Sequence, residues 1–244
     1  MIRTRAYLTR ELREIDRIAE DEFAMPPLLL MEHAAIGLAD VVTTAMPTGD
    51  TSPGSPGPVV FVTGRGNNAG DGFAAARILT DRGVPTIAAM TTSAASLGTL
   101  ATVNYRMAAA RGVEMRRAEN RSTSLATLLE RARPAVVVDA MLGTGLSRLI
   151  EGETLAAVLD INQQRQQHGT VVVAADVPTG LDADTGDALP EAVNADITAT
   201  FAGRKHGFDR ADGPACTGTV ITVPIGAPPA LLDRFGTPWN AVER

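Results

Sequence analysis

Short apolar runs alternate with longer helical segments through most of the chain, and this alternation constrains the fold more than any other feature. The runs consist mainly of Val, Ile and Ala; they lie at 59–62, 85–91, 135–140, 170–177, 195–201 and 219–225, with a weaker one at 112–113. Runs that are continuously apolar are typical of strands buried on both faces of a sheet. Strands and helices in turn predict a parallel sheet joined by right-handed crossovers, and therefore an α/β protein.

The length of 244 residues and the hydrophobic content of 45% suit one large domain, so we expect a single domain over residues 1–244. A stretch rich in Pro, Gly and Ser at 47–58 is interpreted as a surface loop within that domain. Before it, Thr9 is expected to cap a first helix. Pro27 is expected to open a second, buried helix, on which His33 is interpreted as a core histidine.

Composition narrows the possible partners. A net charge of −6 argues against a general nucleic-acid binder, because binding to phosphates needs clustered Lys and Arg. The lone cysteine, Cys216, excludes an internal disulfide and is interpreted as a small packing residue; a reducing compartment fits this, and we expect a cytoplasmic protein. No uninterrupted run reaches about 18 apolar residues and the charged start is no secretory signal, so no membrane partner is expected.

Four polar, Gly-rich loops follow strands of the predicted sheet. They are GRGNNAGDG at 64–72, DAMLGTGLS at 139–147, DVPTGLDADTG at 176–186 and FAGRKHGF at 201–208. In a parallel sheet, ligands bind outside the carboxyl ends of the strands. Turns need glycine in any case, but several such loops at one edge, each adjoining Asp, Asn or Lys, predict a ligand site.

The first loop matches G-x-G-x-x-A at Gly64, Gly66 and Ala69, between a strand and a helix, as a dinucleotide-binding turn requires. Such a loop lets backbone amides and a helix N-terminus approach phosphate. A dehydrogenase also needs an acid about 20 residues further on to hold the ribose, and residues 84–104 contain none. An NAD(P)-dependent oxidoreductase is therefore the weaker alternative. A plain strand-to-helix turn is a further alternative, but it does not account for the asparagines and Asp71.

Three charged residues stand where the strands end. Asp139 and Asp176 are each interpreted as a general acid or base, or as a metal ligand, with a helix cap or a turn bond as the alternative. Asn and Asp oxygens on loops suit a hard cation. Lys205 is interpreted as a donor to a phosphate or a developing anion, with a solvated loop lysine as the alternative. No His/Cys cluster has zinc spacing, and no G-x-S-x-G is present.

Taken together, the loops resemble those of the NAD(P)H-hydrate epimerase family, the YjeF N-terminal domain. The family patterns are G-P-G-N-N-G-G-D-G, D-A-L-L-G-T-G-L-S, D-I-P-S-G-L-D-A-D-T-G and A-D-x-T-x-T-F-x-x-x-K-x-G. A further likeness joins MPPLLLMEHAA at 25–35 to the family helix that contains L-M-E-x-A. The matches follow the family order from about residue 10 to 225, nearly the whole chain.

The resemblance implies a Rossmann-like three-layer α/β/α sandwich, present as a homodimer. It implies interconversion of the R and S hydrates of NADH and NADPH, alongside a separate NAD(P)H-hydrate dehydratase that many bacterial relatives carry fused. This chain is expected to be the epimerase alone. A non-catalytic nucleotide-binding or scaffold module of the same fold is the other alternative, and its signature would be loss of Asp139, Asp176 or Lys205; all three are present.

Carried over by position, the family's residues give the expected site. The catalytic roles are inferred instead from the chemistry that the reaction needs, with Asp176 as the acid or base and Lys205 as its electrostatic partner. The resemblance implies that a potassium ion would be bound by Asn68, Asp139 and Thr179. Substrate contacts would come from Asp176 and from Asn67, Asn68, Ala69, Gly70, Asp71, Gly143, Thr144, Gly145, Leu146, Ser147, Arg148 and Leu149.

Three positions depart from the family pattern: Arg65 replaces proline, Ala69 replaces glycine and Thr179 replaces serine. Arg65 adds a candidate phosphate contact, and Thr179 keeps the hydroxyl. The inverted carbon carries a hydroxyl beside a ring nitrogen, so reversible loss of that hydroxyl or ring opening would scramble it. Both routes need proton transfer and stabilisation of a changing charge.

Overall fold

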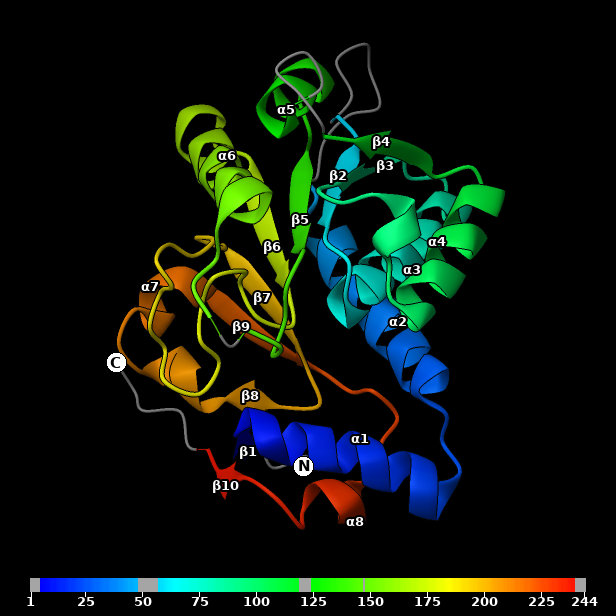
Figure 1. Cartoon of the computed structure of the whole chain (residues 1–244), viewed down its shortest axis with the longest axis vertical. Helices are drawn as coiled ribbons and strands as arrows, with labels where there is room; N and C mark the ends of the chain where they lie inside the picture. The colour runs from blue at the N-terminus through cyan, green and yellow to red at the C-terminus, as the bar shows by residue number, and fades with distance from the viewer. Residues whose placement is uncertain (1–4, 48–56, 119–123, 147, 240–244) are drawn as a thin grey trace.

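The main sheet of the computed structural model has seven strands, all parallel, in the order β4-β3-β2-β5-β6-β7-β9 (Figure 1). The structure describes residues 5–47, 57–118, 124–146 and 148–239. Most of the expected 47–58 loop, and Ser147, lie outside these residues. The strands of the main sheet are β2 (Val59–Thr63), β3 (Thr86–Met90), β4 (Glu114–Arg117), β5 (Val136–Ala140), β6 (Val171–Ala175), β7 (Ile197–Phe201) and β9 (Thr219–Val223).

Helices cover both faces of this sheet, which confirms the predicted three-layer α/β/α class. The helices are α1 (Thr9–Phe23), α2 (Pro27–Ala45), α3 (Asn67–Asp81), α4 (Thr99–Ala110), α5 (Leu125–Ala132), α6 (Gly152–His168), α7 (Gly213–Thr217) and α8 (Pro229–Leu232), with 3-10 turns at Ala94–Ser96 and His206–Asp209. Helices α2, α3 and α4 lie on one side and α5 and α6 on the other (Figure 1).

The central strands are apolar throughout because alternate side chains enter two different cores. In β2, Val59 and Phe61 pack with α2, α3 and α4, whereas Val60 and Val62 pack with α5 and α6. All four are fully buried. Successive side chains of a strand point to opposite faces, so a strand between two helical layers needs an apolar residue at every position.

Helix α2 begins at Pro27, as predicted, with a proline at its first turn. By length and composition α2 could cross a membrane, but it packs against α3 and against strands β6, β7 and β9. It is thus a core helix of this fold. His33 is exposed on its outer side and contacts the carbonyl oxygen of Leu29; its interpretation as a core histidine is wrong, because its helical face does not meet the sheet.

The strand order reverses between β2 and β5. From β2 the chain adds β3 and β4 to one side of the sheet, and from β5 it adds β6, β7 and β9 to the other. The connections that leave β2 and β5 therefore diverge to opposite faces and leave a crevice between them. This reversal places a potential ligand site at the carboxyl ends of β2, β5 and β6.

A second, three-stranded sheet, β10-β1-β8, was not predicted. Strand β1 (Arg5–Tyr7) pairs in parallel with β8 (Arg204–Lys205) and antiparallel with β10 (Thr237–Pro238). Strand β1 thus connects the start of the described chain with its end. Helix α1, which follows β1 directly, faces the carboxyl ends of the main strands (Figure 1). Strands of two or three residues have no periodicity that a sequence could reveal.

Two local expectations need correction. Thr9 is the first residue of α1 and not its cap: the backbone N–H and the hydroxyl of Thr9 donate to Asp184, while the carboxylate of Glu11 accepts from the N–H of Leu8, the residue before the helix. The segment Asn67–Gly72, expected as loop, forms the first turns of α3, so its amides belong to a helix N-terminus.

Candidate active site

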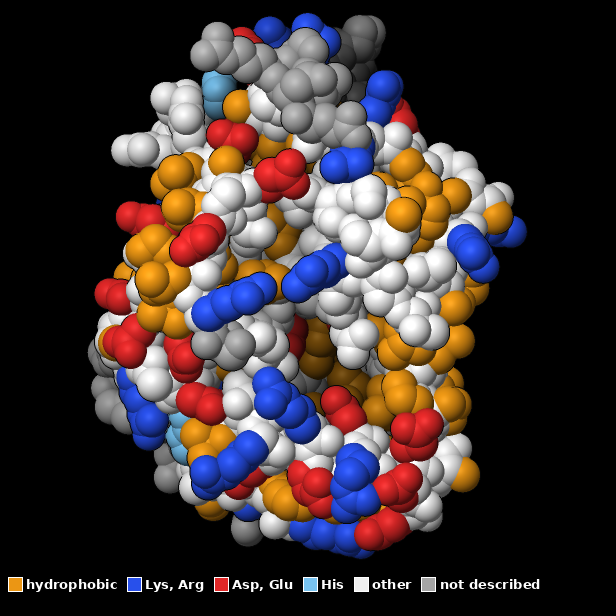
Figure 2. Space-filling view, viewed as in Figure 1, with side chains coloured by type: hydrophobic (Ala, Val, Ile, Leu, Met, Phe, Trp, Pro, Cys, Tyr) orange, Lys and Arg blue, Asp and Glu red, His pale blue; other side chains and the backbone are white. Residues whose placement is uncertain are grey.

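A cleft of about 490 Å³ opens at the strand reversal, between the carboxyl ends of the main strands and helix α1. Figure 2 shows the hollow near the middle of this face, with apolar side chains inside and charged side chains around its rim. The lining residues that carry chemistry come from five places. These are Asp16 and Arg13 on α1; Arg65, Asn67, Asn68 and Asp71 before and within α3; Met141 to Gly145 after β5; Asp176 after β6; and Lys205 on β8.

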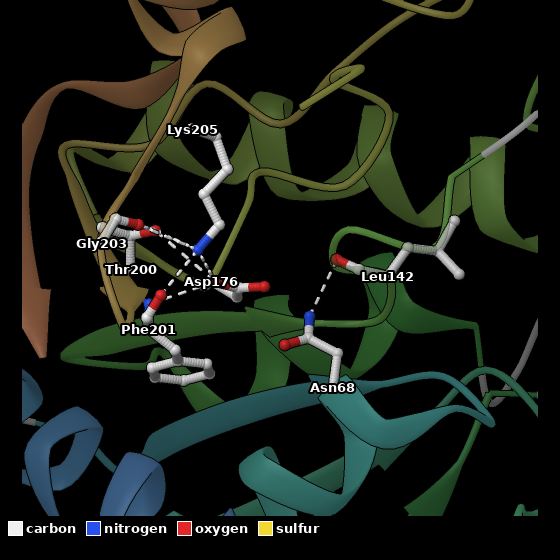
Figure 3. A network of polar contacts seen from close by, with 7 residues as sticks. All are labelled: Asn68, Leu142, Asp176, Thr200, Phe201, Gly203 and Lys205. Carbon is white, nitrogen blue, oxygen red and sulfur yellow. Dashed lines mark hydrogen bonds and ion pairs between the residues drawn. The ribbon is translucent and has the colours of Figure 1, made fainter. Parts of the chain in front are cut away.

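The ammonium group of Lys205 and the carboxylate of Asp176 form the central ion pair. Lys205 Nζ lies 2.5 Å from Asp176 Oδ1, and the lysine side chain is 1% exposed. The same ammonium donates to the hydroxyl of Thr200 at 2.7 Å and to the carbonyl oxygens of Phe201 and Gly203 (Figure 3). Paired and hydrogen-bonded in this way, a lysine can stay charged while buried. The alternative of a solvated loop lysine is wrong.

The carboxylate of Asp176 uses one oxygen for this network. Oδ1 also accepts from the backbone N–H of Phe201 at 3.1 Å. Oδ2 has no hydrogen-bond donor among the described residues, and it lies beside Gly143, where an added Cβ would come within 3.3 Å of it. One oxygen is thus anchored, and the other faces the cleft where a substrate proton could be transferred.

The backbone at Asp176 is held in an unusual conformation. Its φ is +65°, in the left-handed region that non-glycine residues rarely adopt, and its N–H donates to the carbonyl oxygen of Ala199 at 2.9 Å. Aspartate tolerates this region better than most residues, although such strain still costs about 1–3 kcal/mol. The left-handed turn at the end of β6 points the side chain towards β8 and the cleft.

The predicted substrate residues of α3 separate into two groups. Asn67, Asn68 and Asp71 line the cleft. Ala69 is fully buried in the core below α3, and Gly70 packs against Met31 and Ala101, with no room for a Cβ. Helical geometry explains the division, because residues three and four apart share a face.

The predicted residues after β5 line two adjoining clefts. Gly143, Thr144 and Gly145 face the first cleft, while Leu146, Arg148 and Leu149 line the second, of about 1020 Å³, together with Gly145. Arg65 lines both clefts. The two clefts together form an elongated site, with an arginine where they meet.

The predicted potassium ligands gather around Leu142. Thr179 donates its hydroxyl to Asp139 Oδ1 at 2.7 Å and accepts from the N–H of Leu142 at 3.0 Å, while the side-chain amide of Asn68 donates to the carbonyl oxygen of Leu142 at 2.8 Å. Asp139 Oδ2 accepts the N–H of Thr179 at 2.7 Å. Burial raises the pKa of Asp139 to about 6, against the lowering effect of these hydrogen bonds.

This donor set fits a large monovalent cation. Asn68 Oδ1 is buried and has no hydrogen-bond partner among the described residues. Buried polar atoms are normally satisfied, so this oxygen is available to accept a hydrogen bond or to bind an ion. The side-chain amide of Asn68 contacts the Leu142 carbonyl through its nitrogen, and the Thr179 hydroxyl, which donates to the Asp139 carboxylate, accepts from the backbone N–H of Leu142. Within the described residues, no group of three or more His, Cys, Asp or Glu could hold a metal, and a set of low charge favours a roomy ion over Mg²⁺.

Two further carboxyl groups in the cleft have raised pKa values. Burial, followed by the negative charges of Asp176 and Asp16, raises the pKa of Asp71 well above its usual value, and Lys205 opposes this. Partial desolvation and the charge of Asp176 raise the pKa of Asp16 to about 6, again opposed by Lys205. Asp16 as a residue is exposed, so solvent screens its charge more than that of Asp71. Asp16 was missed by sequence reasoning, since nothing in the sequence of α1 points to a cleft.

A parallel α/β sheet with a charged cleft at its strand reversal defines a Rossmann-like protein with a site for a nucleotide-sized ligand. More particularly, the chain belongs to the family described as YjeF-related protein N-terminus, whose model matches residues 28–207. The match covers every strand from β2 to β8.

Curated relatives carry names that state an activity. The chain is 32% identical over 229 residues to the NAD(P)H-hydrate epimerase of Rhodopirellula baltica, covering 93% of this chain and 86% of the relative. It is 34% identical to the enzyme of the same name from Pirellula staleyi, covering 95% and 96%. It is 35% identical to the bifunctional NAD(P)H-hydrate repair enzyme Nnr of Salinibacter ruber, of which it covers 41%.

Among solved structures, the chain is similar to the crystal structure of the yeast protein YNL200c. The TM-score is 0.79 at 20% identity, covering 98% of this chain and 96% of the yeast chain. At this identity the likeness supports the fold alone.

Proposed function

We propose that this protein epimerises the R and S hydrates of NADH and NADPH. The observation that carries the proposal is the buried Lys205–Asp176 pair, whose free carboxylate oxygen faces a cleft in a chain that is 32–34% identical to proteins named NAD(P)H-hydrate epimerase. Inverting a carbon that bears a hydroxyl beside a ring nitrogen requires proton transfer to and from oxygen. An anchored carboxylate at the cleft wall can perform this transfer.

The two adjoining clefts suit the rest of a dinucleotide. The first, with Asp176 and Lys205, would take the hydrated nicotinamide ring. The second would take the remaining part of the molecule, with its phosphates near Arg65, just before α3, and Arg148, in the connection after β5. Guanidinium groups and helix N-termini both bind phosphate.

A potassium ion would be held by Asn68, Asp139 and Thr179, with the carbonyl oxygen of Leu142. When bound, such an ion supplies positive charge beside a buried carboxylate and ties together three segments that line the cleft. Asn68 comes from α3, Asp139 from β5 and Thr179 from the loop after β6. These residues therefore position the walls of the site, whereas Asp176 and Lys205 handle the proton.

Two features argue against the alternative functions. The scaffold alternative predicts loss of Asp139, Asp176 or Lys205, yet each is buried or part-buried and hydrogen-bonded within one site. The oxidoreductase alternative lacks an acid for the ribose in residues 84–104.

The relatives from Salinibacter ruber and Thermofilum pendens, named bifunctional repair enzymes, support a separate dehydratase as functional partner. A homodimer and a cytoplasmic location remain predictions.

The direct test starts from a single purified epimer of hydrated NADPH, and separately of hydrated NADH. Chromatography follows the R:S ratio with and without the protein, since both hydrates also equilibrate without a catalyst. We expect the protein to bring either epimer to the equilibrium ratio much faster than buffer alone. A ratio that changes only at the buffer rate would overturn the proposed function.

A further inference from the structure

Asp16 is the one carboxylate of the cleft that does not belong to the main sheet or its connections. It lies on α1, with Leu12 and Arg13 of the same helix also facing the cleft. Apolar residues of α1, including Ile15 and Ala19, are buried against the rest of the protein. Among the described residues, no side chain forms an ion pair or a hydrogen bond with Asp16, although Glu14 and Asp21 of the same helix are both paired with Arg17.

Asp16 and Asp176 reach the cleft from two elements that face each other. Asp176 follows β6 at the carboxyl edge of the main sheet, and α1 lies facing that edge (Figure 1). Side chains from both line the same hollow. A flat ring bound between them would present one of its faces to the sheet edge and the other to α1.

The two carboxylates are also linked electrostatically. The charge of Asp176 contributes to the raised pKa of Asp16, and Lys205 acts on it in the opposite direction. The charged groups that face Asp16 are Asp71 from α3, Asp176 after β6 and Lys205 on β8, with Arg13 beside it and Arg65 across the cleft. Asp176 thus disfavours and Lys205 favours the ionised form of Asp16, as expected for charged groups that share one cleft.

Inversion of the hydrated ring needs proton transfer on both faces. If the hydroxyl leaves, the ring nitrogen's electron pair forms a C=N bond and the carbon becomes planar. The leaving oxygen takes a proton from an acid on the face that it leaves. Water must then add from the other face and lose a proton to a base there. One carboxylate serves one face, so it can exchange the oxygen but cannot invert the centre.

We propose that Asp16 is a second acid/base residue of this site and serves the ring face opposite Asp176. For the epimer whose hydroxyl faces α1, Asp16 donates its proton as the C–O bond breaks and a water molecule leaves. Water adds from the side of Asp176, forming the new C–O bond and returning the electron pair to the ring nitrogen, and Asp176 takes the proton. One water is lost and one gained, nothing is oxidised or reduced, and solvent returns the proton to Asp16. For the other epimer the roles reverse.

This inference rests on the proposed function, and its test separates the two. Each purified epimer of hydrated NADPH is incubated in H₂¹⁸O, and chromatography with mass spectrometry follows inversion and oxygen exchange independently. The variants are Asp16→Asn and, as the matched control on the same exposed side of α1, Glu20→Gln. Binding of NADPH, which has no hydroxyl to lose, is measured by calorimetry to show that each variant keeps its cleft.

We expect Asp16→Asn to slow inversion by about 100- to 10,000-fold while Glu20→Gln behaves as the native protein. The epimer whose hydroxyl faces Asp176 should still take up ¹⁸O with its configuration retained, and the other epimer should do neither. Asp16→Glu, which restores a carboxyl group, should recover part of the inversion rate and covers the case in which the Asn variant binds NADPH poorly.

Three outcomes would overturn the second acid/base role. One is inversion by Asp16→Asn at the rate of Glu20→Gln. Another is equal loss of exchange for both epimers in Asp16→Asn. The third is native inversion without ¹⁸O uptake, which indicates ring opening. In each of these the native protein is still an epimerase; a native protein that changes neither epimer would instead contradict the proposed function.

Discussion

Lys205 Nζ lies 2.5 Å from Asp176 Oδ1 in a site where the lysine is almost wholly buried and the aspartate is not. The Lys205 ammonium also donates to the hydroxyl of Thr200 and to the carbonyl oxygens of Phe201 and Gly203. The pair is therefore fixed from the lysine side, and the aspartate keeps Oδ2 for the cleft. This asymmetry assigns proton transfer to Asp176 and charge stabilisation to Lys205.

Asp176→Asn should slow epimerisation by about 100- to 10,000-fold, because an amide has the shape of the carboxylate but cannot exchange its proton. Lys205 retains three acceptors, so the fold and the affinity for NADPH should largely persist. Initial rates on each epimer, with circular dichroism and calorimetric titration of NADPH, check this. A variant with a near-native rate would leave Asp176 as a structural partner of Lys205.

Gly143→Ala should reduce turnover without unfolding the protein. A Cβ at this position would lie 3.3 Å from Asp176 Oδ2, which is closer than ordinary contact, and 3.5 Å from Cγ of Asn68. Displacing a catalytic oxygen by a fraction of an ångström can cost about 10- to 100-fold. Gly145→Ala is the matched control, because nothing lies within 4 Å of its added Cβ. Equal rates for the two variants would show that the close packing of Gly143 against Asp176 has no role in catalysis.

Asp71→Asn should make the protein more stable at pH 8 than the native chain, with little difference at pH 4. Burial raises the pKa of Asp71 in the folded state above its value in the unfolded chain. The folded state then holds a proton that the unfolded chain releases, so native stability falls as pH rises from about 4 towards the folded pKa. Because the amide of Asp71→Asn does not ionise, the stability of this variant does not fall in that pH range.

Thermal unfolding of the native chain and Asp71→Asn at several pH values measures the difference, and each kcal/mol corresponds to about 2–4 °C for a chain of this size. Glu20→Gln, with an exposed carboxyl group, controls for charge alone. A difference in Tm that stays constant from pH 4 to pH 8 would contradict the raised pKa.

Asn68→Ala should abolish a potassium-dependent gain in stability. A ligand that binds only the folded state stabilises it by about 2.7 kcal/mol at 100 times its Kd. We expect the native chain to unfold at a higher temperature in KCl than in LiCl of equal ionic strength. Asn67→Ala, at the exposed neighbouring position, should keep that difference. A native Tm that is the same in both salts would remove the potassium site.

The sequence was informative where side-chain type alone decides the structure. Continuous apolar strands predicted the parallel sheet, and the polar residues at strand ends predicted the edge at which the site lies. Asp176 and Lys205, 29 residues apart, meet in one ion pair, as expected for an acid or base with an electrostatic partner.

The remaining parts of the site depend on tertiary contacts that have no local signal. Asp16 faces the cleft only because α1 is carried to the sheet edge by β1, β8 and β10. The segment 67–72 reads as a loop because of its glycines and asparagines, yet it is helical since Gly70 and Gly72 allow close packing on Met31 and Ala140. Propensity is a weak guide where such packing decides.

The three-stranded sheet β10-β1-β8 joins two segments that are synthesised at very different times. Helix α1 is made early, but β1 pairs with β10, and Arg5 donates to the carbonyl oxygens of Phe235 and Gly236 while Glu11 accepts the N–H of Gly236. A nascent chain could form the main sheet, with Asp176 and Lys205 in place, before these contacts between β1 and the residues near β10 exist. The contacts of β1 with β10 would form only once Pro238 had left the ribosome, so the side of the cleft that carries Asp16 would be completed after the side that carries Asp176.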